Sequence, residues 1–178
     1  MKKYSLKVES PYDDGEQKVI VIDKDSHIYE RVDGGHIWEK YIVRNGATLT
    51  LDMRADMREG RDKVADIYHE ILLDSDNAKA VVMARGVVAE NNKIIYRSNI
   101  KTEKNYKNLK GQESMHFVML DTRSEVDAIP MLEIENNMIE STHSMSITRI
   151  DNKKRFYMLM HGLEEKEAEQ LYVESLLR

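Results

Sequence analysis

Cysteine is absent from the 178 residues of this chain. That single absence excludes disulfide bonds, thiolate metal ligands, persulfide carriers and cysteine nucleophiles. Chemistry that depends on a thiol or thiolate is therefore ruled out unless a partner supplies the sulfur.

Long apolar runs are also missing, and proline and glycine are scarce. No run approaches the roughly 20 apolar residues of a membrane-spanning helix, and the lysines near the N-terminus are not followed by the apolar stretch of a signal peptide. With two prolines and eight glycines, no linker or low-complexity segment divides the chain. We expect a cytoplasmic protein of one domain, with or without a small appendage, and no membrane partner.

Basic residues are outnumbered, with 27 Lys and Arg against 32 Asp and Glu, for a formal net charge of −5. Binding to nucleic acid phosphates needs a basic surface, so nucleic acid is not an expected partner. Hydrophobic residues make up 41% of the chain, which is enough for a folded core.

Short strands separated by turn signals dominate the chain up to about residue 134. In one of them Ala47, Leu49 and Leu51 share one parity, whereas Thr48 and Thr50 take the other, which is typical of a half-buried strand. Similar strand-forming segments occur at 18–22, 36–43, 65–73, 80–89, 94–97, 115–120 and 131–134. Without a crisp internal repeat, the pattern alone is compatible with a sandwich, a barrel or a β-solenoid.

The C-terminal tail changes to helical periodicity. Asp151 is a candidate N-cap for a first helix, which His161 and Gly162 should end because glycine is a usual helix stop. A second helix is expected from about Glu164 to Leu177, with acidic residues in its first turn. The expected divisions are a loosely ordered N-terminus at 1–15, a β core at 16–150 and a helical pair at 151–178.

Motifs for catalysis or metal binding give no specific signal. The histidines are His27, His36, His69, His116, His143 and His161. No two of them have metal-ligand spacing on one element, and Leu73 stands where a zinc-protease motif beginning at His69 needs its second histidine. Phosphate loops and a serine elbow are missing. Carboxylates are abundant but nothing selects a pair, so an enzyme with an unrecognised acidic site is the least favoured alternative.

Three segments near the C-terminus are notable for their order and spacing. They are IPMLEIENN at 129–137, STHSMSITRID at 141–151 and RFYMLMHGLEEKEA at 155–168. Each resembles a signature stretch of the SufB/SufD (SufBD) family of iron–sulfur cluster assembly proteins. Segments 84–88 and 94–100 resemble weaker strand patterns of that family, so the resemblance covers roughly residues 50–178.

This resemblance implies a mostly β fold, a right-handed parallel β-helix (β-solenoid) with a small C-terminal α-helical segment. It also implies a non-catalytic scaffold that pairs through its β-helix edges with another SufB/SufD-type subunit or with itself as a dimer. The C-terminal helices would dock a SufC-type ABC ATPase, and the candidate docking residues are Arg155, Tyr157, His161, Gly162 and Glu165. The alternative is a β-solenoid protein-binding module unrelated to iron–sulfur assembly.

The signature positions of the family transfer to this chain only in part. His143 falls on the family's histidine and is a candidate ligand at a cluster interface. The next residue is Glu in SufB-type and Gly in SufD-type members, but Ser144 here, and Ser124 lies nearest the place of a SufB-type cysteine. Because a serine hydroxyl is a poor ligand for soft metals, we expect a SufD-like or degenerate member. Such a chain would bind no cofactor tightly by itself and would meet an iron–sulfur cluster only in a complex.

Overall fold

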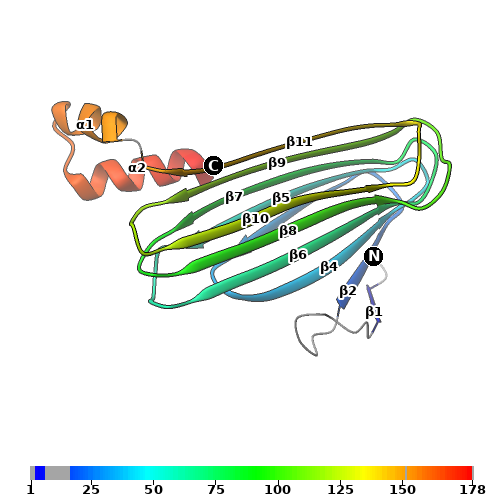
Figure 1. The fold of residues 1–178 in the computed structure, drawn as a ribbon, viewed down its shortest axis with the longest axis horizontal. Coiled ribbons are helices and arrows are strands. Elements are labelled where there is room, and N and C mark those ends of the chain that lie inside the picture. Colours follow the sequence, from blue (N-terminus) through cyan, green and yellow to red (C-terminus); the bar gives the residue numbers. More distant parts are fainter. Residues whose placement is uncertain (1–2, 7–16, 151, 178) are drawn as a thin grey trace.

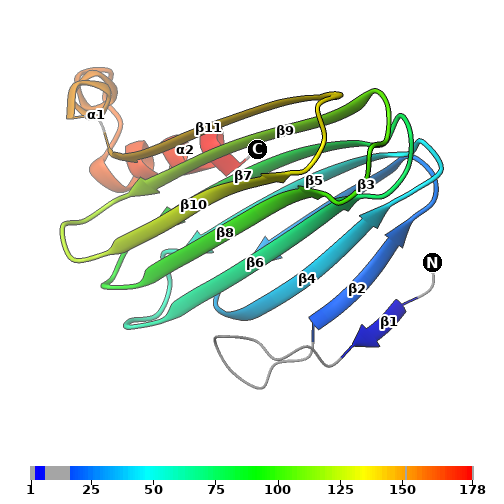
Figure 2. The ribbon, with the colours of Figure 1, turned by 45° about the vertical axis from the view of Figure 1, so that its right-hand side comes forward.

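The computed structural model describes residues 3–6, 17–150 and 152–177, and its strands form two sheets that face each other across a shared interior (Figures 1 and 2). Sheet A has the order β1 (Lys3–Leu6), β2 (Gln17–Ile22), β4 (Gly35–Val43), β6 (Val64–Leu73), β8 (Lys93–Thr102) and β10 (Glu125–Ile134). Sheet B has the order β11 (Ile139–Arg149), β9 (Leu109–Met119), β7 (Lys79–Val88), β5 (Thr48–Met57) and β3 (Ser26–Val32).

From β2 onward, successive strands alternate between the two sheets, so the chain winds as a β-solenoid of about four turns. Each of these strands pairs in parallel with the strand one turn later, for example Gly35 with Ala65 and Thr48 with Lys79. The antiparallel pairing of β1 with β2 departs from this rule. The predicted β-solenoid is confirmed, and its strands are longer than several of the apolar segments that indicated them.

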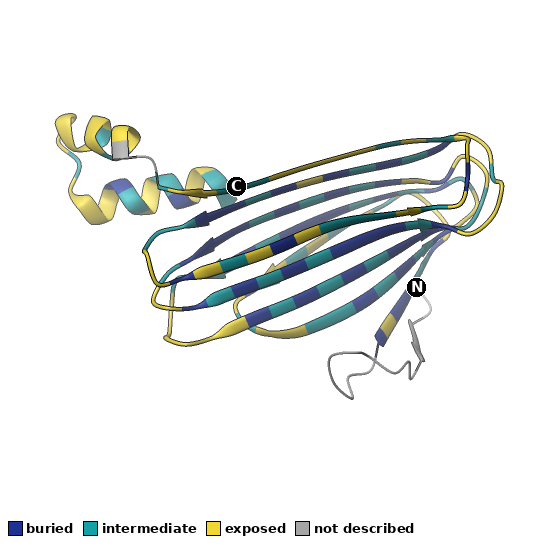
Figure 3. Cartoon of the chain, in the orientation of Figure 1, coloured by how far each residue is buried: buried dark blue, intermediate teal, exposed yellow. Residues whose placement is uncertain are grey.

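The interior contains two apolar clusters, one toward each end of the strands. One includes Tyr41, Leu49, Ile71, Val82 and Ile100, and the other includes Met53, Ile67, Ile94, Tyr96 and Phe117. Figure 3 shows the alternation of buried and exposed residues that produces this interior. Between the two clusters lie Glu39, His69 and Ser98, which are buried register partners on β4, β6 and β8. A polar layer therefore crosses the apolar interior.

Gly86 occupies a closely packed position inside the solenoid. Gly86 on β7 is the register partner of Phe117 on β9, and a Cβ atom at Gly86 would lie 2.7 Å from Phe117 Cδ1. The same atom would lie 3.2 Å from the Cβ of Ala55 on β5. Glycine at this position leaves room for the Phe117 ring.

Two helices follow β11, namely α1 (Asn152–Met160) and α2 (Glu165–Leu177), and they confirm the predicted helical tail. Gly162, with a φ of 87°, lies in the turn after α1. Val173 of α2 packs on Val87 and Val118 of sheet B, and the Arg54 guanidinium of β5 donates to the carbonyl of Leu177. The helical tail is thus attached to the outer face of sheet B.

The predicted loose N-terminus and the predicted helix cap lie partly or wholly outside the described residues. Residues 3–6 of the expected loose N-terminus form β1, and the remainder of 1–15 lies outside the described residues. The predicted cap Asp151 also lies outside them. No helix in the described ranges is long and apolar enough to cross a membrane.

Candidate functional site

The family-signature positions lie on or near the last turn of the solenoid. His143 and Ser144 are exposed neighbours on β11, where Ser144 Oγ donates to Ser114 Oγ at 3.3 Å. Ser124 is buried in the turn before β10, and its backbone N–H donates to Asp121 Oδ1 at 2.8 Å. His143 and Ser144 therefore share a strand, whereas Ser124 lies apart from them at the start of the preceding strand.

The candidate docking residues gather around the junction of α1 and α2. Arg155 forms an ion pair with Glu165 across the two helices. The rings of Tyr157 and His161 lie 4.2 Å apart, and His161 Nδ1 is 2.8 Å from the Tyr157 carbonyl oxygen. With Gly162 in the turn between them, the five residues form one local surface rather than scattered positions.

The helical pair keeps large apolar side chains on its surface. Phe156, Tyr157 and Met160 are exposed by 63%, 65% and 69%. A groove of about 480 Å³ lies between the helices, with Tyr157, Met158, Leu171 and Tyr172 in its apolar part and Lys153, Lys154 and Ser175 in its lining. Exposed apolar area of this kind, with charged residues beside it, is typical of a surface that meets another protein.

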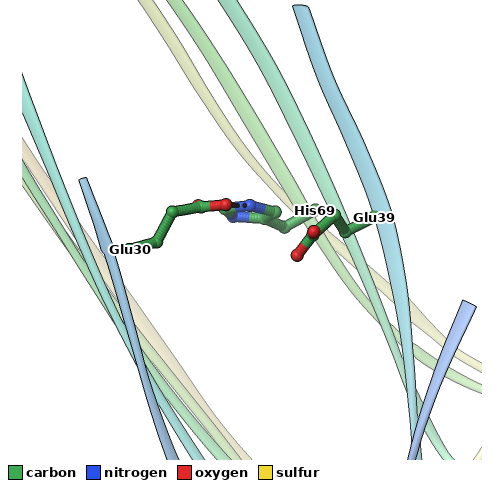
Figure 4. A group of neighbouring side chains, drawn as sticks. All are labelled: Glu30, Glu39 and His69. Carbon is green, nitrogen blue, oxygen red and sulfur yellow. Dashed lines mark ion pairs between the residues drawn. The ribbon is translucent and has the colours of Figure 1, made fainter. Parts of the chain in front are cut away.

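A second cluster lies inside the first turns of the solenoid and joins Glu30 of β3, Glu39 of β4 and His69 of β6 (Figure 4). One side-chain ligand atom from each residue lies within 4.8 Å of the others. His69 is completely buried, and Glu39 and Glu30 have side chains exposed by only 9% and 16%. Figure 4 shows that Glu30 reaches across from one sheet toward His69 on the other.

Hydrogen bonds and rings hold this cluster in place. Glu39 accepts from the Lys18 ammonium on one oxygen and from the Tyr41 hydroxyl on the other. His69 Nδ1 lies 3.2 Å from Tyr96 Oη, and the imidazole meets the rings of Tyr41 and Tyr96 edge-on. Burial first, and then the charge of Glu39, raises the pKa of Tyr41, so its hydroxyl stays protonated and donates.

The polar layer continues to Glu113 of β9. This side chain is nearly fully buried, and burial raises its pKa to about 7, against a smaller lowering by Ser98. Among the described residues, no contact of its two carboxylate oxygens meets hydrogen-bond geometry. The exposed His143 is its register partner on β11. Glu113 therefore lies at the end of the buried layer, one strand from the signature histidine.

Sequence patterns did not indicate the buried cluster, because its members come from three strands. The usable signal was the parity of His69, which shares its side of the strand with Ile67 and Ile71. Glu39 likewise shares its side of β4 with Ile37 and Tyr41. A polar residue on the apolar side of a strand indicates a buried polar contact, but does not name the partner.

Comparison with known proteins matches the solenoid and the helical tail together. The model of one family, described as "SUF system FeS cluster assembly, SufBD core domain", matches residues 35–176. The chain belongs to the SufBD family. The match begins earlier than the expected limit near residue 50, so the second turn of the solenoid is part of the SufBD core.

Curated relatives agree with this assignment. An iron–sulfur cluster assembly SufBD family protein of Staphylococcus aureus (strain USA300) is 23% identical over 128 residues. A protein of the same description from Staphylococcus saprophyticus is 22% identical over 128 residues. Each alignment covers 72% of this chain and 26% of the relative, so the chain spans about a quarter of the length of these SufBD proteins. SufBD membership supports a role in iron–sulfur cluster assembly.

Proposed function

We propose that this SufBD-family chain is a non-catalytic scaffold subunit in iron–sulfur cluster assembly. The observation that carries the proposal is the extent of the family match, which includes both the solenoid and the helical pair. A rigid parallel solenoid suits a scaffold, because its backbone hydrogen bonds are satisfied within the coil and its ends remain available to partners.

The helical pair is the proposed contact for a SufC-type ABC ATPase. Its exposed apolar side chains and the groove lined by Tyr157, Leu171 and Tyr172 provide area that another protein would bury. The Arg155–Glu165 ion pair and the contact between Tyr157 and His161 fix the surface before binding, which reduces the entropy lost on association.

The last turn of the solenoid is the proposed contact for a second SufB/SufD-type subunit or a second copy of this chain. Within the described part of the chain, β10 and β11 each pair on one side only, so their outer edges present backbone groups to a partner. Exposed Met145 and His143 lie on β11 at this edge.

The iron–sulfur cluster is cargo in this proposal. Because the chain has no thiolate, it does not fit the requirements for holding a cluster alone. His143 is the proposed contribution of this chain to a site completed by the partner subunit.

Co-expression with the SufC-type ATPase of the same genome tests the docking contact. We expect the full chain to capture the ATPase and a chain lacking residues 151–178 to lose it. Since that deletion uncovers Val87 and Val118, a Tyr157→Ala/Leu171→Ala variant is the sharper probe, because both residues line the groove and are exposed. The amount of ATPase captured by this double variant should fall at least about tenfold, which corresponds to a loss of about 1.4 kcal/mol of binding free energy.

Met138→Ala is the matched control, since Met138 is an exposed apolar residue between β10 and β11 rather than on the helices. Capture by this control should equal that of the wild type. A folded full chain that captures no ATPase would refute the docking proposal. That result would favour a protein-binding solenoid outside iron–sulfur assembly.

A further inference from the structure

The contact between Glu30 and His69 is close but is not a hydrogen bond. Glu30 Oε2 lies 3.0 Å from His69 Nε2, yet the direction of approach fails hydrogen-bond geometry for both atoms. Buried polar atoms normally have a partner, and an unmet one costs free energy. Glu30 Oε2 and His69 Nε2 can both donate an electron pair, and a cation bound between them would satisfy both atoms.

The spacing of these atoms suits a common metal ion. Ligand atoms bound at about 2.1 Å to one ion lie about 3.0–3.4 Å apart for octahedral to tetrahedral angles. The 3.0 Å between Glu30 and His69 falls in this range, and a Glu39 oxygen lies within 4.8 Å of both. Glu39 would become the third ligand by turning an oxygen from Lys18 or Tyr41 toward the ion.

The surroundings of His69 match those of a metal-binding histidine. Its Nδ1 faces Tyr96 Oη at 3.2 Å, so an Nδ1–H donated to that oxygen leaves the Nε2 lone pair available to an ion. The edge-on rings of Tyr41 and Tyr96, 5.9 and 5.6 Å away, hold the imidazole plane. This partner on the second ring nitrogen fixes both the tautomer and the orientation.

The local charge also favours a cation. Among the described residues, the ammonium group recorded against these two carboxylates is that of Lys18, and it contacts Glu39. Among the described residues, the groups around His69 include these two carboxylates, the hydroxyls of Tyr41 and Tyr96 and its register partner Ser98, with apolar clusters on either side. Such a site leaves a negative charge uncompensated unless His69 takes a proton or an ion binds.

We propose that Glu30, Glu39 and His69 bind one divalent first-row transition ion inside the solenoid. One imidazole and two carboxylates suit Zn²⁺ better than the all-oxygen preference of Mg²⁺. The ion would cross-link β3, β4 and β6, three strands from successive turns and both sheets. It would add a resident ion to a chain for which the sequence predicted no tightly bound cofactor of its own.

Titration of the purified full chain with Zn²⁺, after treatment with a chelator, tests this site by calorimetry. We expect one Zn²⁺ per chain, a Zn²⁺-dependent rise in melting temperature and no displacement by excess Mg²⁺. His69→Gln and Glu30→Gln should each weaken binding by at least about tenfold. The controls His143→Gln and Glu113→Gln remove an exposed imidazole and a buried carboxylate outside the cluster, and should bind as the wild type does.

X-ray absorption at the zinc edge identifies the ligands of the ion in the wild type, so it tests the site even if a buried variant fails to fold. The wild-type spectrum should show one imidazole ligand with oxygen ligands, and the His143→Gln spectrum should be the same. Absence of stoichiometric Zn²⁺ binding would show that Glu30, Glu39 and His69 do not hold an ion. Loss of binding in His143→Gln would place the ion on the surface. Either result overturns the proposal.

Discussion

The interior of the solenoid changes the pKa of one buried residue, Glu113. Its side chain is 3% exposed between the apolar Val82 and the uncovered β11, and burial raises its pKa to about 7. The neighbouring Tyr96 has a pKa raised well above its ordinary value, first by burial and then by the charge of Glu113. At neutral pH, the buried layer therefore contains a carboxyl group that changes charge while the tyrosine does not.

The folded chain should lose stability as the pH rises through 7 because of Glu113. Its pKa is raised in the folded state, so the folded state binds the proton more tightly than the unfolded chain does. The stabilisation is complete below about pH 4.5 and is lost toward pH 8, with an upper limit of about 3 kcal/mol. Urea unfolding of wild type and Glu113→Gln between pH 5 and 8 measures this loss, because only the wild type should become less stable, relative to the variant, as the pH rises.

An exposed carboxylate provides the comparison for this pH dependence. Glu135→Gln removes a carboxylate just after β10 and should give a curve parallel to that of the wild type. If Glu113→Gln is also parallel to the wild type over this range, the buried carboxyl group does not have a raised pKa.

Each strand limits the size of the inward side chains on the strands that pair with it. In a parallel solenoid, each inward position of one turn packs directly on the register partner in the next. Gly86 and Phe117 are such a pair, with Ala55 on the other side of Gly86. Two small residues, Ala55 and Gly86, precede the large Phe117 in this stack, so a larger side chain at Gly86 would push on the neighbouring strand.

Gly86→Ala should destabilise the fold by about 1–3 kcal/mol, because the new methyl group would overlap the Phe117 ring. Urea unfolding measures the loss. In a Phe117→Leu background the same alanine should cost less, since the smaller side chain leaves space, and the double-mutant cycle should give a coupling of about 0.5 kcal/mol or more. Additive effects would contradict the packing explanation.

On the scale of the whole molecule, the two ends of the solenoid differ. At the last turn, β10 and β11 present open edges with exposed Ile129 and Met145. Within the described residues, the helical tail covers part of the outer face of sheet B and leaves these edges uncovered. Open parallel edges with apolar side chains favour association with another sheet.

A second copy of the chain should pair through this edge, and Met145→Lys should prevent it. Lysine on an edge strand opposes strand pairing, and little stability is lost because Met145 is already half exposed. Sedimentation velocity should show a concentration-dependent dimer for the wild type and a monomer for Met145→Lys. Met138→Lys, beside β11 but outside both edge strands, should still dimerise. A dimer unchanged by Met145→Lys would place the contact elsewhere.

The sequence by itself determined the local features of this protein. Alternation in segments such as 47–53 predicted which side of those strands is buried, and the residues at 161–162 predicted where α1 ends. These features depend on neighbours within a few residues, so local physics is enough to predict them. The absence of cysteine likewise excluded thiolate chemistry, because composition alone decides whether a thiol is present.

Only the tertiary structure decided how the strands stack, because alternation shows a buried side but not the partner strand. The repeat is hidden in the sequence since the register offset changes, from Gly35 paired with Ala65 to Lys18 paired with Glu39. The cluster of Glu30, Glu39 and His69 depends on that register and on the facing of the two sheets. Contacts made across three turns have no local pattern, and folding of the whole solenoid is what brings their atoms together.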